Sequence, residues 1–292
     1  MPIPNIGFGH KQSNQAELQI LDLAELYARK NIGHSPEQPH RVRFFAIIYI
    51  EQGSGCHMVD FKHYPFQTGS VIFLQRDQVH NFDFSREPQG KVLLFTQAFL
   101  DQIHANMRLP NYTPTHLNIL YSPLLQLNSS EHSNTQTLLD LMITEIAHTQ
   151  NDPLIVMYLF SAFALSLHRL RPELKQHKLS QEHSFRFSRF FELIQQNFHK
   201  IRDANWYAAQ INTTYKTLNH VSKLATGLTA KQLIDSYTII EIKRQLVINN
   251  ITSKQLAYDL GFEDASNFIK YFKKLTNYTP SQFTQINKQP SL

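Results

Sequence analysis

The sequence has few of the residues that certain classes of protein require. Among its 292 residues there is one cysteine, Cys56, which excludes an internal disulfide framework and a cysteine-rich zinc site. Charged residues make up 17% and hydrophobic residues 42%, which excludes a wholly disordered chain and suits about two domains with buried cores. No run approaches the roughly 18 apolar residues of a membrane helix, and Met1–His10 lacks the features of a secretion signal. We therefore expect a soluble, cytoplasmic protein with no membrane partner.

The motifs of common catalytic sites are missing as well. The chain contains no P-loop, no GxSxG nucleophile motif and no glycine fingerprint for a dinucleotide. Its 15 histidines are scattered along the chain, a distribution that does not indicate metal storage. The sequence therefore predicts a protein that is not an enzyme, with no catalytic residues, no cofactor and no metal.

The basic residues are concentrated in the last third of the chain. Residues 1–184 contain 14 lysines and arginines against 16 aspartates and glutamates, whereas residues 185–292 contain 14 against 7. A basic domain attached to a mildly acidic one indicates a polyanion as the partner of the C-terminal part. A charged surface that only keeps the domain soluble explains the same numbers.

Short β-strands are predicted between about residues 40 and 99. The segments are rich in β-branched and aromatic residues, and turn residues such as Gln52–Gly55 lie between them. They are Val42–Glu51, Cys56–Phe61, Val71–Leu74, Val79–Phe84 and Lys91–Thr96. This spacing favours a small antiparallel barrel or jelly roll.

Helices are predicted after the strands. Asn134–Thr149 has apolar residues near the helical period, and Pro153 is placed to begin a second helix through Leu170. Arg171–Ser184 is polar and is the best candidate for a linker. We expect an N-terminal domain over residues 1–170, a linker over 171–184 and a helical domain over 185–292.

An internal repeat occupies the helical part. Leu218–Leu233 aligns with Phe268–Phe283 at a constant offset of 50. The aligned pairs are Lys223 and Lys273, Thr226 and Thr276, Thr229 and Thr279, and Gln232 and Gln282. The preceding segments, Ala208–Ile211 and Ala257–Leu260, align at an offset of 49, so the second copy has one extra residue in its turn. Two helix–turn–helix units joined by a helix are the simplest architecture.

The second copy is predicted to contain a short helix, Ser253–Leu260, with Ser253 at its N-cap, and a longer helix capped by Asp264. In the longer helix Phe268, Phe272 and Leu275 recur at helical spacing and are expected to face inward. The outer side is then polar and mostly cationic: Ser266, Asn267, Lys270, Lys273 and Lys274.

The first copy follows the same pattern. Leu218, Val221 and Leu224 are expected to face inward, and the outer side consists of Lys216, Asn219, His220 and Lys223. A helix of this kind can enter the major groove of DNA, where asparagine and lysine contact base edges and phosphates. An ordinary solvated amphipathic helix has the same pattern, but two such helices about 50 residues apart favour double-stranded DNA as the partner.

Residues from about Ser188 to Gln285 resemble the DNA-binding domain of the AraC/XylS family of bacterial transcription regulators. Gln255–Phe283 resembles the signature of that family, with its GF turn, aromatic-rich recognition helix, paired lysines and terminal TP. The resemblance implies two helix–turn–helix subdomains that contact successive major-groove segments. It places the recognition helices at about Thr214–Ala225 and Asp264–Leu275.

Four positions depart from the family pattern. Asn277 stands where glycine usually precedes TP, and asparagine accepts the left-handed conformation. Ile269–Lys270 replaces a common serine–arginine pair, Tyr237–Thr238 replaces an arginine at the linker helix, and Phe283–Thr284 replaces an aromatic–arginine ending. These changes leave the fold intact. Because of them, the base contacts of other family members cannot be assigned to this chain.

Pro39–Phe84 resembles the cupin-type barrel of the effector-sensing members of the family. The resemblance rests on His40, the turn at Gly53–Gly55, the hairpin at Tyr64–Gly69 and His80. Enzymatic cupins use several histidines and a glutamate as metal ligands, and here a complete ligand set is absent. A small-molecule pocket or a purely structural barrel is therefore preferred, and His40 and His80 can each be structural or ligand contacts.

The barrel is predicted to hold a largely apolar effector with one polar or anionic end. The candidate lining combines aromatic and aliphatic residues with three polar ones: His40, Arg43, Phe45, Ile47, Tyr49, Phe73, His80 and Phe82. A barrel filled by its own aromatic side chains is the alternative.

The sequence as a whole predicts an α+β, two-domain transcription regulator that binds specific DNA. Activation is the commoner behaviour in the family it resembles, with RNA polymerase as a further partner. We expect a homodimer, formed by apolar surface of the segments 134–149 and 154–170. A cupin-type metalloenzyme with an attached helical module is the alternative, and a general DNA-compacting protein is a third possibility.

Overall fold

The computed structural model describes residues 4–8, 17–28, 36–83, 85–107, 122–171, 179–248 and 251–288. Two compact units divide the chain, one over Pro4–Gln176 and the other including His177–Leu292. Phe84, at the end of a predicted strand, and residues 172–178 of the predicted linker lie outside the described residues.

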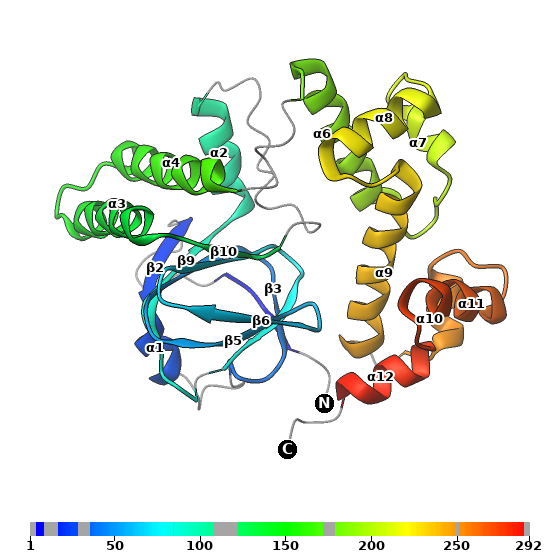
Figure 1. The fold of residues 1–292 in the computed structure, drawn as a ribbon, viewed down its shortest axis with the longest axis horizontal. Helices are drawn as coiled ribbons and strands as arrows, with labels where there is room; N and C mark the ends of the chain where they lie inside the picture. The colour runs from blue at the N-terminus through cyan, green and yellow to red at the C-terminus, as the bar shows by residue number, and fades with distance from the viewer. Residues whose placement is uncertain are drawn as a thin grey trace. The chain divides into compact units, whose positions relative to one another are not determined.

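The N-terminal unit contains two five-stranded sheets with helices beside them (Figure 1). One sheet has the strand order β1 (Asn5–Ile6), β3 (His40–Val42), β8 (Val79–Phe82), β5 (Ser54–Val59) and β6 (Lys62–Gln67). The other has the order β10 (Leu124–Gln126), β7 (Ser70–Leu74), β4 (Phe45–Gln52), β9 (Gln89–Phe95) and β2 (Leu18–Asp22). Strands pair antiparallel except β1 with β3. The predicted cupin-like fold is confirmed, with one parallel pair at an edge.

The predicted strands differ in their bounds from the observed ones, most clearly in two cases. The segment Val42–Glu51 is divided between β3 and β4, and Cys56–Phe61 ends at Val59 because Asp60 and Phe61 have positive φ angles of 47° and 67°. Strand β6 was missed as a separate strand because it contains Pro65. It lies at the edge of its sheet, where a residue without an N–H is tolerated.

The described residues of this unit form four helices: α1 (Leu23–Ala28), α2 (Gln97–Met107), α3 (Ser129–Ala147) and α4 (Pro153–Leu170). Helix α3 begins five residues before the predicted Asn134. The reason is a capping box in which Asn128 Oδ1 accepts from Glu131 N at 2.9 Å and Glu131 Oε2 accepts from Asn128 N at 2.9 Å. Helix α4 begins at Pro153 as predicted, and the Asp152 side chain caps it.

Helix α4 is the one described helix that is long and apolar enough to be compared with a membrane span. It has 18 residues and a mean hydropathy of 1.5, enough by length and composition alone to cross a bilayer. A core helix of a soluble protein meets the same criterion, and several α4 residues are buried in the cluster that also contains strand residues: Met157, Phe160, Phe163, Ala164 and Leu167.

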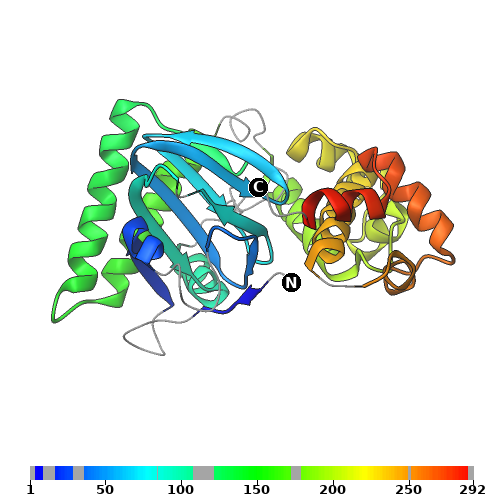
Figure 2. The same cartoon turned by 90° about the horizontal axis from the view of Figure 1, so that it is seen from below.

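The described elements of the C-terminal unit are all helices, coloured from green to red in Figure 2. They are α6 (Gln181–Asn197), α7 (Ala204–Gln210), α8 (Tyr215–Thr226), α9 (Ala230–Ile248), α10 (Ser253–Asp259), α11 (Ala265–Thr276) and α12 (Pro280–Lys288). Helix α9 contacts α7 and α8 as well as α10, α11 and α12, so it joins the two predicted subdomains.

The structure differs from the predicted linker at both ends. Helix α6 begins at Gln181, before the predicted end at Ser184. Arg171 is 1% exposed; its guanidinium lies 4.2 Å from the centre of the Phe73 ring, and Nη1 donates to Ser122 O at 2.6 Å. Arg171 is therefore part of the N-terminal unit and not of a solvated linker.

Candidate DNA interface and effector pocket

The two helix–turn–helix units repeat each other as the sequence predicts. Helices α8 and α11 align at an offset of 50, and α7 and α10 align at 49. The turns contain Asn212 and Gly261, which align at the offset of 49 and both have positive φ, 52° and 68°. The extra residue of the second turn lies after Phe262, because Phe262 N bonds to Ala257 O just as Thr213 N bonds to Ala208 O.

The aligned threonines and glutamines make the same hydrogen bonds in both copies. Gln232 N donates to Thr229 Oγ1 at 3.2 Å, and Thr229 N donates to Gln232 Oε1 at 2.9 Å. Thr279 and Gln282 repeat this capping box at the same distances. The repeat is therefore set by the backbone groups that each helix start must satisfy.

The recognition helices have the predicted positions, with Thr214 and Asp264 as their N-caps. Asn277 ends α11 with φ 65°, the left-handed conformation expected for it. Three details were wrong. Thr252, and not Ser253, caps α10; Leu275 is 42% exposed; and Leu224 is half-buried.

Eight of the nine predicted DNA-contacting side chains are exposed, on the outer faces of α8 and α11. They are Lys216, His220, Lys223, Ser266, Asn267, Lys270, Lys273 and Lys274. Asn219 is half-buried, and its Oδ1 accepts from Ala230 N at 2.9 Å at the start of α9. Asn267 Nδ2 donates to Asp264 Oδ2 at 2.7 Å. Both asparagines therefore have intramolecular partners in this structure.

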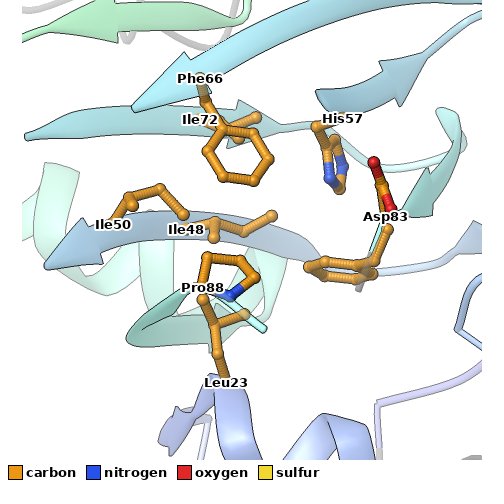
Figure 3. A pocket seen from close by; sticks show the side chains of 9 residues that line it. Leu23, Ile48, Ile50, His57, Phe66, Ile72, Asp83 and Pro88 are labelled. Atoms are coloured by element: carbon orange, nitrogen blue, oxygen red, sulfur yellow. The ribbon is translucent and has the colours of Figure 1, made fainter. Parts of the chain in front are cut away.

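A pocket lies between the two sheets of the N-terminal unit (Figure 3). It has about 230 Å³ of empty space, part of it open to solvent. Its lining comes from α1, β4, β5, β6, β7, β8 and the loop after β8: Leu23, Ile48, Ile50, His57, Phe66, Ile72, Phe82, Asp83 and Pro88.

Most of the predicted effector lining lies on the face of the sheet opposite the pocket. Phe45, Ile47, Tyr49 and Phe73 belong to the core formed with α2, α3 and α4, whereas Ile48 and its neighbours face the pocket. Because side chains alternate along a strand, a prediction displaced by one residue selects the opposite face.

The remaining predicted lining residues have separate positions. Tyr49 Oη lies 2.7 Å from Nδ1 of His132, so its hydroxyl has a partner in α3. Arg43 is exposed, and among the predicted lining residues only Phe82 borders the pocket. His40 and His80 are buried beside it, with ring centroids 4.2 Å apart.

His57 is the pocket residue that sequence inspection missed. Its ring is 1% exposed, 5.4 Å from the His80 ring and 4.8 Å from the Phe82 ring. Burial, reinforced by nearby His40, lowers the pKa of His57 to about 3, so the imidazole is neutral near pH 7. Among the described residues its Nε2 has no hydrogen-bond partner, a condition that costs about 1–3 kcal/mol in a folded protein. Among the described residues no group of three or more His, Cys, Asp or Glu could hold a metal ion.

Two family models match the chain. One, described as a helix-turn-helix domain, matches residues 207–286, and the other, described as an AraC-like ligand binding domain, matches residues 24–163. The chain belongs to the AraC family of transcription regulators. The predicted family is therefore confirmed for both parts of the chain.

The similar AraC-family proteins include the HTH-type transcriptional activator RhaS from two bacteria. RhaS of Pectobacterium carotovorum subsp. carotovorum is 24% identical over 257 residues, 84% of this chain and 86% of that protein. RhaS of Escherichia coli O157:H7 is 23% identical over 252 residues, 86% and 87% of the two chains. Among solved structures, ToxT of Vibrio cholerae with a bound unsaturated fatty acid has a TM-score of 0.43 and 15% identity, covering 91% of this chain and 94% of that one.

A contact between the two helix–turn–helix units was also missed from the sequence of this AraC-family chain. Arg202, just before α7, donates from Nη1 to Leu260 O at 2.7 Å and from Nη2 to Gly261 O at 3.3 Å. Its guanidinium lies 3.9 Å from the centre of the Phe262 ring. These three partners form the turn of the second unit, so one arginine joins the two units. No sequence motif marks it, because its partners are backbone carbonyls.

Proposed function

We propose that this AraC-family regulator binds a specific promoter site through the outer faces of α8 and α11 and activates transcription there. The observation that carries the proposal is the pair of recognition helices with equivalent caps and eight exposed polar or cationic side chains. The RhaS relatives, named as transcriptional activators, support activation rather than repression of transcription. RNA polymerase is then a partner, and the cytoplasm is the place of action.

The two helices supply different contacts in this proposal. Lysines attract phosphates at any sequence, and side chains at the centre of each outer face contact base edges. The Asp264 carboxylate holds the Asn267 amide in the free protein, so this amide must exchange partners before it bonds adenine. Lys270 and Lys273 need no such exchange, because α11 presents both side chains to solvent.

An effector in the N-terminal unit controls DNA binding in the same proposal. The support is the match to a ligand-binding domain and the pocket between the sheets. An effector acts only if it binds the DNA-competent and the incompetent states with different affinities. A coupling of about 1–3 kcal/mol gives a usable switch.

The regulator forms a homodimer through the outer side of α3 and α4. Helix α4 buries part of its apolar surface on the sheet and leaves the rest exposed, together with one leucine of α3: Leu141, Leu154, Ile155 and Tyr158. A symmetric contact between two such surfaces is the common form of a dimer. Sedimentation of the full chain, compared with a Leu154→Glu variant, tests it; a wild-type monomer at micromolar concentration with and without DNA contradicts it.

The DNA-binding proposal is tested with the full chain and a site selected from random duplexes. Lys270→Ala is expected to weaken binding by about 1–3 kcal/mol, and log K should fall steeply with log salt. Lys62→Ala is the matched control, since Lys62 is exposed in the N-terminal unit. Equal affinity of all three proteins for the site would contradict the proposal. Stoichiometric iron, manganese or zinc in the purified protein would favour a cupin enzyme instead.

A further inference from the structure

We propose that the effector is an uncharged, largely apolar molecule that lies between the sheets and hydrogen bonds to Nε2 of His57. The proposal rests on the effector control proposed above and names the chemistry of the effector. The enclosed part of the space between the sheets is far smaller than the apolar cavity of about 150 Å³ that holds a benzene molecule, so the side chains that line it must move apart when the ligand enters.

The lining favours an apolar body. Seven of the nine lining residues have apolar side chains, contributed by both sheets, by the first residue of α1 and by Pro88. His57 and Asp83 are the polar ones, and in Figure 3 they lie at one side of the pocket. A water molecule needs two to four polar partners, whereas one hydroxyl or carbonyl on an apolar ligand needs a single partner. His57 Nε2, buried and without a partner, supplies it.

The same lining excludes an anion, contrary to the polar or anionic end expected from the sequence. The described residues that line the pocket include no lysine or arginine. Hydrogen bonds from Ser85 hold the pKa of Asp83 below its usual range, so its carboxylate stays charged and repels a second negative charge. An anion would therefore lose its hydration without gaining a counter-charge.

Three matched probes test this class of ligand: benzyl alcohol, ethylbenzene and benzoate. Their binding to the full chain is measured by saturation-transfer NMR and titration. We expect benzyl alcohol to bind, ethylbenzene to bind about two- to tenfold more weakly for lack of one hydrogen bond, and benzoate not to bind. His57→Phe should remove the difference between the first two, and Ile48→Phe, which fills the pocket, should abolish both.

Benzoate binding as tight as that of benzyl alcohol would overturn the proposal, as would benzyl alcohol binding unchanged in Ile48→Phe, or no binding of any probe. Affinity for the selected DNA site is measured for every variant. Retained DNA binding shows that the variants are folded. It also separates a failure of the proposed ligand class from a failure of the proposed regulator function.

A second inference comes from Arg202: we infer that it is a positioning residue that fixes the distance between the two base contacts. This inference rests on the proposed DNA binding. The Arg202 guanidinium holds the carbonyls of Leu260 and Gly261 and lies on the Phe262 ring. Phe262 in turn packs on Phe268 and Tyr271 of α11, with ring centroids 5.4 Å apart in both pairs.

The backbone supports the same contact. Gly261 has φ 68°, and a Cβ there would lie 3.4 Å from His199 O, so the second turn packs closely on the segment that leads into α7. On the other side, Tyr271 Oη donates to Asp235 Oδ1 of α9 at 2.8 Å. Helix α11 is thus held both to α9 and to the first unit, and these contacts set its position relative to α8.

The test uses the selected site and two versions with one base pair inserted or removed between its two halves. One base pair changes both the distance and the angle between successive grooves. We expect wild-type protein to lose at least about tenfold in affinity on either altered site. Arg202→Met, which keeps the stem but not the donors, should bind the selected site more weakly and show less than about threefold discrimination.

Arg202→Lys, which keeps one charged donor, should recover part of the discrimination, and Arg189→Met on α6 is the matched control. Circular dichroism verifies that each variant is folded. A folded Arg202→Met protein that keeps the full wild-type discrimination would overturn the inference. If the wild-type protein showed no salt-sensitive binding to the selected DNA site, that result would instead overturn the proposed function.

Discussion

The two helix–turn–helix units share their backbone contacts and differ in their side-chain surfaces. Both have the same capping boxes, and both have a left-handed residue in the turn and another at the end of the recognition helix. On the outer faces only Lys223 and Lys273 are alike. The other aligned pairs differ: Lys216 and Ser266, Thr217 and Asn267, Asn219 and Ile269, His220 and Lys270, and Leu224 and Lys274. Duplicated units of this kind keep one fold while each can contact its own base sequence.

One difference follows directly from the backbone. In the first unit Asn219 Oδ1 accepts from Ala230 N, the first N–H of the following helix. The aligned pair in the second unit is Ile269 and Pro280, and proline has no N–H to satisfy. The first unit thus has an asparagine that accepts a hydrogen bond from the backbone N–H of Ala230. The second unit, where Pro280 has no N–H, has the aliphatic Ile269 at the aligned position.

The largest effect is expected from Phe272→Ala, which tests how far the second unit depends on its aromatic core. Phe272 is fully buried between Phe268 and Phe283, with ring centroids 6.3 Å and 5.8 Å away. Removing such a ring costs about 3–5 kcal/mol of unfolding free energy. Urea unfolding followed by the fluorescence of the single tryptophan, Trp206 in α7, reports on the C-terminal unit. A loss below about 1 kcal/mol would contradict the assignment of this core.

The second prediction compares Asn219→Ala with Ile269→Ala. Loss of the Asn219 amide leaves Ala230 N without its acceptor, which should cost about 1–3 kcal/mol. Ile269 is 37% exposed, so its truncation should cost less than about 1 kcal/mol. The same unfolding measurement serves both variants. If Ile269→Ala were the more destabilising, the comparison of the two pairs would be wrong.

The features predicted from the sequence are those with a local signal. The recognition helices and the Asp264 cap follow from residues three or four positions apart, and the helix bounds agree within about one residue. The pocket was not predictable in this way. Its lining comes from strands distant in the sequence, and the choice between Ile47 and Ile48 depends on which face of the sheet the helices cover. The Arg202 contact was missed for a similar reason, because its acceptors lie 58 and 59 residues away.

The two capping boxes should stabilise the protein equally. Thr229→Ala and Thr279→Ala are therefore expected to lower the unfolding free energy by the same amount. Each substitution removes a hydroxyl that accepts from the backbone N–H three residues later, at 3.2 Å in both units. The expected cost is about 1 kcal/mol in each case. Thr→Ser variants at the two positions are the controls, since serine keeps the acceptor. If the two Thr→Ala variants differed by more than about 1 kcal/mol in their loss of unfolding free energy, the same hydrogen-bond geometry would not give the same stabilisation in the two units.

The smallest effect, and of opposite sign, is expected at the position of the first unit that aligns with Phe272. Ser222 is fully buried, and its Oγ has no hydrogen-bond partner in the part of the chain that the structure describes. A buried hydroxyl without a partner loses its hydrogen bonds to water and gains none in the protein. Ser222→Ala should therefore leave the unfolding free energy unchanged or raise it by up to about 1 kcal/mol. Alanine also favours the helix more than serine does. The measurement is the same urea titration, followed by the fluorescence of Trp206.

Ser222→Val, which adds volume to a closed core, is the contrasting variant and should destabilise the protein. A loss of more than about 1 kcal/mol in Ser222→Ala would mean that the hydroxyl has a partner in solution, and that the first unit depends on a polar contact where the second depends on an aromatic ring.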